Sequence, residues 1–351
     1  MGDSGNAEST VSHLHFEIYD GEEAINPYDG LVNSSTHLSK PVVSYPQAQN
    51  EILPNGIDST FRGGGSVALG NVDLDPADEV VTGAGKGGSY VKIFDLDRKQ
   101  LSRFAPNGTS FKGGVDVALG DVDNDGTDEI VTGAGPGGSY VKVFELDGQQ
   151  ISRFAPNGTS FTGGVDVAVG DIDNDGTDEI ITGSGKGGSY VKAFELDGTE
   201  IIRFAPYGDD FKYGITVGAG DVSGDLREEI ITGPRVGGGP RVSVYDNAGV
   251  RSQTFYAYDS SFTGGIRVEV ANTDTGTPKS EILTVPQQKG APRVKMFSGT
   301  GTSLGFTDFF AEEWWKGYYD LAASSNTIMS SIGIDRRTAV RVVDEDSHGG
   351  H

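Results

Sequence analysis

Two stretches of this chain are nearly identical, and this repetition constrains the fold more than any other feature. One begins at Gly113 and reads GGVDVALGDVDNDGTDEIVTGAGPGGSYVKVFELDG, and the other begins at Gly163 and reads GGVDVAVGDIDNDGTDEIITGSGKGGSYVKAFELDG. Related copies carry an anchoring phenylalanine at roughly 50-residue spacing, at Phe61, Phe111, Phe161, Phe211 and Phe262. A period of this length is typical of propellers and other repeat arrays.

Each repeat has the pattern of four short strands. The segment VDVALGDV alternates, with Val115, Val117 and Leu119 on one face. The segments EIVTGAG, YVKVFELD and ISRFAP follow, separated by Gly-rich or Asn-Gly turns of the kind that hairpins require. Four antiparallel strands per repeat form a propeller blade, whereas a parallel β-helix has shorter repeats and a helical solenoid has a 3.6-residue period. We therefore predict an all-β propeller.

The number of blades depends on the degenerate ends of the chain. Residues 315–322 align with the opening strand of the repeats, and residues 338–343 resemble a third strand. Residues 40–45 match another third strand, so N-terminal strands could complete the last blade and seal its edge. We expect six blades over residues 38–345, or seven if residues 20–60 hold further strands. We expect residues 346–351 to form a disordered tail.

Composition excludes several classes of function. The chain has 351 residues and a formal net charge of -24, which argues against nucleic acid and anionic membranes as partners. It has no cysteine, so disulfides, thiolate catalysis and cysteine-bound zinc are excluded. No apolar run approaches the roughly 18 residues that span a bilayer, and no secretion signal is readable at the start. We expect a monomer without membrane insertion.

The acidic loop between the first two strands predicts a calcium site. Carboxylates at positions 1, 3 and 5, a backbone carbonyl near position 7 and an acid at position 9 can surround Ca²⁺ with its preferred oxygen ligands. Gly126 allows the sharp turn after the third carboxylate. One such loop could equally be an ordinary Asp-Asn turn, but two full copies in register favour calcium. The predicted ligands are Asp121, Asp123, Asp125 and Glu129, and Asp171, Asp173, Asp175 and Glu179.

Two further loops keep part of this pattern, and we expect weaker calcium binding there. Pro76 replaces the turn glycine in one, and Leu226 replaces it in the other. Their predicted ligands are Asn71, Asp73, Asp75 and Glu79, and Asp221, Asp225 and Glu229. The fifth and sixth repeats have lost the pattern. The chain is therefore expected to hold about two strong calcium sites and up to four in total.

These repeats resemble FG-GAP repeats of the VCBS and integrin-α type. The segment Gly133-Ala134-Gly135-Pro136 matches the motif that names the family, and the acidic loop lies just before it. The resemblance implies a six- or seven-bladed propeller stabilised by calcium. It also implies an extracellular or cell-surface location and a role in adhesion, in binding glycans or proteins, or as an accessory domain of a secreted enzyme.

The first 32 residues resemble a different family, the M23 (lysostaphin-like) zinc endopeptidases that cleave peptidoglycan. The His-Leu-His motif matches that family's His-x-His, which implies that His15 binds zinc and His13 assists catalysis. A catalytic zinc needs about three protein ligands, and the family supplies the others from upstream. We therefore expect no completed zinc site in this chain, which looks like the C-terminal part of a longer protein. An ordinary strand is the alternative.

The sequence thus predicts a calcium-binding propeller that acts as an extracellular or cell-surface binding module, originally appended to a peptidoglycan endopeptidase. The expected partners are peptidoglycan, a surface glycan or a protein. The alternatives are a zinc endopeptidase completed by a missing half, and a lectin. For a lectin, the cluster at Trp314, Trp315, Tyr318 and Tyr319 could stack on sugars, although it could also seal the ring. We expect Phe104, Phe154 and Phe204 to pack in the core rather than to form a ligand cage.

Overall fold

The computed structural model describes residues 18–20, 23–25, 51–52, 63–75, 77–273, 278–288, 293–308, 318–324, 327–334 and 336–344. The chain divides into two compact units, Met1–Asn50 and Glu51–His351. In the first unit, β1 (Ile18–Asp20) and β2 (Glu23–Ile25) form an antiparallel two-stranded sheet. Every element formed by the described residues is a strand, so no helix among them could cross a membrane.

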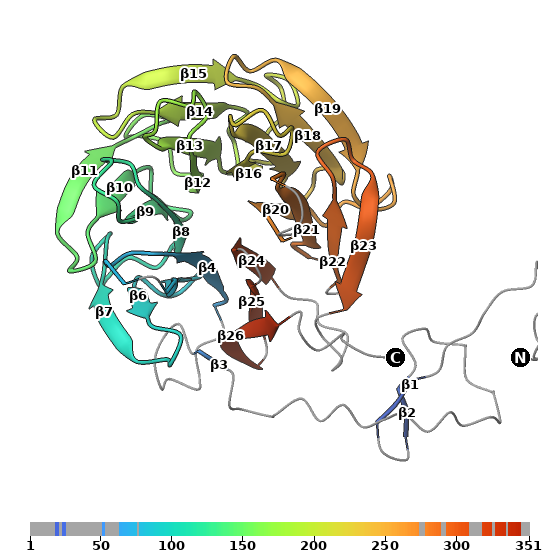
Figure 1. Cartoon of the computed structure of the whole chain (residues 1–351), viewed down its shortest axis with the longest axis horizontal. Coiled ribbons are helices and arrows are strands. Elements are labelled where there is room, and N and C mark those ends of the chain that lie inside the picture. The colour runs from blue at the N-terminus through green and yellow to red at the C-terminus, as the bar shows by residue number, and fades with distance from the viewer. Residues whose placement is uncertain are drawn as a thin grey trace, which may run out of the picture. The chain divides into compact units, whose positions relative to one another are not determined.

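The second unit is an all-β propeller, as predicted from the repeats (Figure 1). Each of its first five blades has four antiparallel strands in chain order. Their bounds in the first three blades are β4 (Gly65–Gly70), β5 (Glu79–Ala84), β6 (Val91–Phe94) and β7 (Gln100–Phe104); β8 (Val115–Gly120), β9 (Glu129–Ala134), β10 (Val141–Phe144) and β11 (Gln150–Phe154); and β12 (Val165–Gly170), β13 (Glu179–Ser184), β14 (Val191–Phe194) and β15 (Glu200–Phe204). The next two contain β16 (Ile215–Gly220), β17 (Glu229–Pro234), β18 (Arg241–Tyr245) and β19 (Arg251–Tyr256); and β20 (Ile266–Ala271), β21 (Glu281–Pro286), β22 (Arg293–Phe297) and β23 (Ser303–Asp308).

The blade count corrects the sequence prediction of six or seven. The described residues form five blades of consecutive strands, and one further four-stranded sheet that is composite. That sheet joins β24 (Tyr318–Ser324), β25 (Thr327–Ile334) and β26 (Arg336–Asp344) to the two-residue strand β3 (Glu51–Ile52). β24 contacts both β20 and β4, and Val340 pairs with Ile52, so chain ends from opposite sides of the unit share this sheet. The predicted strand at residues 40–45 lies outside the described residues.

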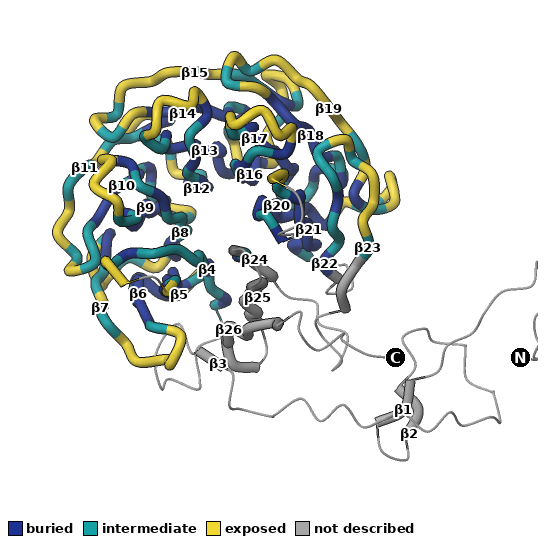
Figure 2. The backbone as a smooth tube through the Cα atoms, in the orientation of Figure 1, coloured by how far each residue is buried: buried dark blue, intermediate teal, exposed yellow. Residues whose placement is uncertain are grey.

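The hydrophobic core of the propeller lies between neighbouring blades. One cluster joins Val81 and Ile93 of the first blade to Val117 and Ile130 of the second, and equivalent clusters follow around the ring. The inner strands of the five blades are mostly buried, and the outermost strands of the first four blades are half-buried or exposed (Figure 2). The alternation in VDVALG therefore buries Val115 and Val117 against the preceding blade.

The phenylalanines at the ends of the fourth strands pack in this core, as predicted. The rings of Phe104 and Phe144 lie 4.6 Å apart between their centroids, which joins the fourth strand of one blade to the third strand of the next. The same contact recurs at 4.7 Å between Phe154 and Phe194. Such tilted aromatic pairs are a favourable packing geometry. The repeated phenylalanine thus serves blade-to-blade packing.

The glycines of the GAG motif are required by close backbone approach. A Cβ atom on Gly135 would lie 2.1 Å from the carbonyl oxygen of Gly113, and the Gly135 N–H donates to the Gly114 carbonyl at 3.0 Å. Any side chain would therefore displace the backbone of the Gly113–Gly114 turn. The motif that names the FG-GAP family consequently has a structural role here.

Candidate metal centre

The loop between β8 and β9 brings three carboxylates together. One oxygen each of Asp121, Asp123 and Glu129 lies within 4.8 Å of the others, and Asp171, Asp173 and Glu179 form the same group one blade later. Ligand oxygens 2.3–2.6 Å from a calcium ion lie at most about 5 Å apart. The spacing of these oxygens therefore fits a single Ca²⁺ in each loop.

Backbone hydrogen bonds give the loop its shape. The Asp121 carboxylate accepts N–H bonds from Asp125 at 3.0 Å and from Gly126 at 2.9 Å, which curls the loop around its first residue. Asn124 and Gly126 have positive φ angles of 60° and 94°. Asparagine tolerates this region and glycine adopts it without penalty, so the Asn-Asp-Gly sequence suits the turn.

Glu129, the first residue of β9, contributes a carboxylate oxygen to the group and also accepts a backbone hydrogen bond. It is only 1% exposed, and its Oε2 accepts the N–H of Val122 at 3.0 Å. Its Oε1 is buried and has no hydrogen-bond partner among the described residues. Burial, followed by the nearby charge of Asp123, raises the pKa of Glu129 to about 8. A buried oxygen without a partner is costly, and a cation within the group would remove that cost.

In the loops 121–129 and 171–179, the residue at position 5 lies outside the three-carboxylate group. Asp125 was predicted to be a ligand, but the three-carboxylate group does not include it. Its Oδ1 instead accepts the N–H and the hydroxyl of Thr127 at 2.9 and 2.7 Å, and these bonds lower the pKa of Asp125. In this conformation Asp125 shapes the turn, and so does Asp175, which accepts the N–H of Thr177 at 2.9 Å.

The two divergent loops also assemble acidic groups. Asp73, Asp75 and Glu79 form one, and Asp221, Asp225 and Glu229 form the other. Asn71 donates through Nδ2 to the Asp75 carbonyl, so its amide braces the first of these loops, while Pro76 lies outside the described residues. Leu226 has a φ angle of 74°, a conformation that is unfavourable for a bulky side chain. This strain gives a physical reason for weaker binding in the 221–229 loop.

The fifth blade retains one feature that the sequence analysis did not recognise. Glu281 occupies the position of Glu129, is buried, and accepts the N–H and hydroxyl of Thr273 at 2.8 and 2.9 Å. Residues 274–277 lie outside the described residues. The N–H and the hydroxyl of one threonine thus both donate to Oε2 of this buried glutamate. Its sequence signal is the Glu-Ile-Leu-Thr segment, which matches the second strand of the other repeats.

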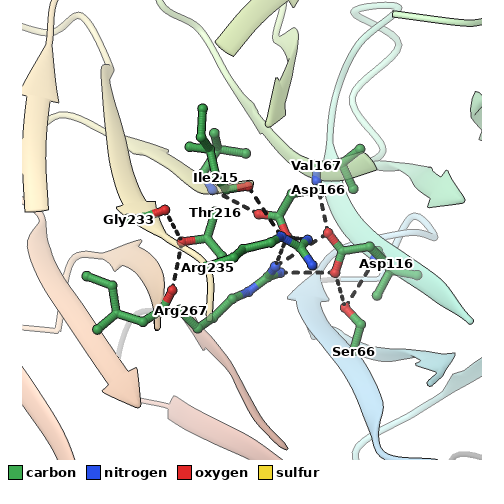
Figure 3. Close-up of polar contacts among 12 residues, drawn as sticks. Ser66, Asp116, Asp166, Val167, Ile215, Thr216, Gly233, Arg235 and Arg267 are labelled. Carbon is green, nitrogen blue, oxygen red and sulfur yellow. Dashed lines mark hydrogen bonds and ion pairs between the residues drawn. The ribbon is translucent and has the colours of Figure 1, made fainter. Parts of the chain in front are cut away.

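A polar network around the propeller axis was also missed (Figure 3). The second residue of the innermost strand is polar in each of the five blades: Ser66, Asp116, Asp166, Thr216 and Arg267. The first four of these side chains form hydrogen bonds with the next blade. Asp116 accepts the Val167 N–H at 2.9 Å. Asp166 accepts the Val217 N–H at 2.8 Å.

Arg267 connects this network across the axis. Its guanidinium lies 2.6 Å from Asp166 Oδ1 and 3.2 Å from Asp116 Oδ1, and Arg235 also donates to Asp166 (Figure 3). Burial raises the pKa of Asp166, while the neighbouring Arg267 and Arg235 charges oppose this rise. The network joins residues 69, 101 and 151 positions apart in the chain. It ties the second, third, fourth and fifth blades together.

Several predicted site residues cannot be placed. His13 and His15 of the peptidase-like motif lie outside the described residues, as do Trp314 and Trp315 of the aromatic cluster. Tyr318 and Tyr319 lie in β24, and only their backbone is described. The zinc site and the sugar-stacking cluster therefore both stay predictions from the sequence.

Part of the chain, including the acidic loops 121–129 and 171–179, is similar to a known family of repeats. Residues 121–182 match the FG-GAP-like repeat. The match begins at the first carboxylate of the second blade's loop and ends within the second strand of the third blade. Together with the propeller, this match supports an FG-GAP propeller. No curated protein sequence matches the chain.

Solved structures show a similar fold at low sequence identity. An outer-coat vertex structure of COPII on membranes is 12% identical over 76% of this chain and 66% of that chain, with a TM-score of 0.50. Rhamnogalacturonan lyase YesW is 14% identical over 77% of this chain and 55% of its own, with a TM-score of 0.43. The V. cholerae biofilm matrix protein Bap1 is 17% identical over 77% and 44%, with a TM-score of 0.42. The chain thus spans about half the length of the latter two.

Proposed function

We propose that this chain is an FG-GAP propeller that binds calcium in the loops 121–129 and 171–179 and acts as an extracellular or cell-surface binding module. The observation that carries the calcium proposal is Glu129. Its buried Oε1 has no partner among the described residues, and one of its two carboxylate oxygens lies in the group with Asp121 and Asp123. Three carboxylates repel one another unless a cation neutralises them, and the hard oxygen set suits Ca²⁺.

The role proposed for calcium is structural. The ion would hold Glu129, at the start of β9, against Asp121, which directly follows β8, and so would fix the connection between the two inner strands of a blade. The same holds for Glu179 and Asp171 in the third blade. An ion that binds only the folded state stabilises it by mass action. Stable blades then keep the loops on both faces in position for a partner.

Calcium binding can be measured by equilibrium dialysis of the purified chain at pH 7.5, followed by metal analysis. We expect about two tightly held Ca²⁺ ions per chain, and neither in the double variant Asp123→Ala/Asp173→Ala. Binding is expected to weaken at pH 5.5, because the pKa values of Glu129 and Glu179 are both raised to about 8 and protons compete with the ion. Equal calcium in the wild type and the double variant would contradict the proposal.

The cell-wall part of the proposal rests on the sequence around His13 and His15. We propose that the module targets peptidoglycan, and that a surface glycan or protein is the alternative partner. Co-sedimentation with purified peptidoglycan tests this directly. The chain is expected to sediment with the polymer in millimolar Ca²⁺, and to be released by EDTA as the loops lose their ions. A chain that stays in the supernatant under both conditions contradicts a peptidoglycan partner.

The competing function is a zinc endopeptidase completed by a missing half. Metal analysis and a cell-wall lysis assay of the same preparation separate the two functions. Stoichiometric zinc together with lysis would support the peptidase. Calcium without zinc would support the binding module.

A further inference from the structure

The first residue of each acidic loop is held by the following blade. The Asp121 N–H donates to Asp178 Oδ2 at 3.0 Å, and the Asp178 N–H donates to the Asp121 carbonyl, also at 3.0 Å. Asn71 and Asp128 make the same two bonds one blade earlier, at 2.9 and 2.8 Å. In each pair, the two residues of neighbouring loops exchange reciprocal hydrogen bonds.

A glycine directly before the loop leaves room for the acidic side chain that makes this contact. A Cβ atom on Gly120 would lie 2.5 Å from Asp178 Oδ2, and one on Gly70 would lie 2.2 Å from Asp128 Oδ2. In the next blade, a Cβ on Gly170 would lie 1.9 Å from Glu228 Oε2, and the Glu228 N–H donates to the Asp171 carbonyl at 3.1 Å. The glycine before each of these three loops therefore leaves room for an acidic side chain from the neighbouring blade.

Asp178 connects the acidic group of the third blade to the acidic group of the second blade. It directly precedes Glu179, whose carboxylate belongs to the group of the third blade. It also fixes the backbone of Asp121, whose carboxylate belongs to the group of the second blade. An ion that fixes Glu179 thus also orders the segment that positions Asp121. Ordering shared by two sites makes their binding mutually favourable.

We infer that neighbouring calcium loops bind cooperatively, with Asp128, Asp178 and Glu228 as the positioning residues that couple each loop to the one before it. This inference rests on the proposed function, because it concerns the same ions. Occupancy of the 171–179 loop raises the affinity of the 121–129 loop by about five- to ten-fold. The effect is reciprocal, since coupling between two binding equilibria acts equally in both directions.

Calorimetric titration of the full chain with CaCl₂ tests the coupling. Asp173→Ala isolates the 121–129 loop and Asp123→Ala isolates the 171–179 loop. The double variant gives the background from the two divergent loops. The overall association constant of the wild type for two ions should exceed the product of the two single-loop association constants by five- to ten-fold. Affinities that simply multiply would overturn the inference, whereas a wild type that takes up no calcium would overturn the proposed function instead.

Variants at position 178 test the positioning role. In the Asp173→Ala background, Asp178→Ala is expected to weaken calcium binding to the 121–129 loop several-fold. Asp178→Asn should restore it, because the amide oxygen can still accept the Asp121 N–H. Asp97→Ala removes an exposed acid from the turn between β6 and β7 and is the charge-matched control, expected to leave the affinity unchanged. Equal weakening by Asp178→Ala and Asp97→Ala would overturn the positioning role.

Discussion

Asp166→Ala is expected to lower the free energy of unfolding by about 3–5 kcal/mol. Asp166 is fully buried and is the closer of the two carboxylates that neutralise the Arg267 guanidinium. Its removal leaves a buried positive charge undercompensated, which is among the most destabilising single changes in a protein interior. The Val217 N–H would also lose its acceptor in the neighbouring blade.

Chemical denaturation followed by fluorescence measures this loss. Asp97→Ala, which removes an exposed acid from the turn between β6 and β7, is expected to change stability by no more than about 0.5 kcal/mol. Asp166→Leu combined with Arg267→Met removes the most buried ion pair and should recover part of the loss, since apolar replacements of buried ion pairs are often tolerated. Recovery is expected to be incomplete, because Arg235 and Asp116 each lose a partner. A loss near that of the control would show that the axial network does not stabilise the ring.

The sequence predicted the features that repeat locally. Alternating apolar residues, Gly-rich turns and a roughly 50-residue period identified four-stranded blades because each signal lies within one repeat. The acidic loops were predicted for the same reason, and the structure gathers Asp121, Asp123 and Glu129 as expected. The ligand role of Asp125 stays a prediction: Asp125 does not join the three-carboxylate group, and its Oδ1 accepts the hydroxyl of Thr127, a short-range partner that the calcium pattern does not consider.

Features that depend on contacts between distant residues were not predictable in this way. Asp116 and Asp166 stand in alternating strands where nothing local distinguishes them from solvent-facing acids, and Arg267 follows 101 positions after Asp166. The positioning role of Asp178 is hidden because its partner Asp121 lies 57 residues earlier. Closure of the last sheet by an N-terminal strand was the exception: the sequence suggested it, and Ile52 pairs with Val340 there, although the strand expected at residues 40–45 lies outside the described residues.

The central claim is that calcium in the loops of the second and third blades stabilises the propeller. At a hundred times its dissociation constant, each ion contributes about 2.7 kcal/mol. Two ions should therefore raise the melting temperature on the order of 10 °C. The expected rise comes from the carboxylate groups containing Glu129 and Glu179, so it should be specific for these loops.

A thermal melt of the full chain in excess EDTA and in millimolar Ca²⁺, with Zn²⁺ as the metal control, is the most direct test. The account predicts a large rise with Ca²⁺ and not with Zn²⁺, and its loss in Asp123→Ala/Asp173→Ala. No rise in the wild type, or the same rise in the double variant, would contradict it and leave the acidic loops as ordinary turns.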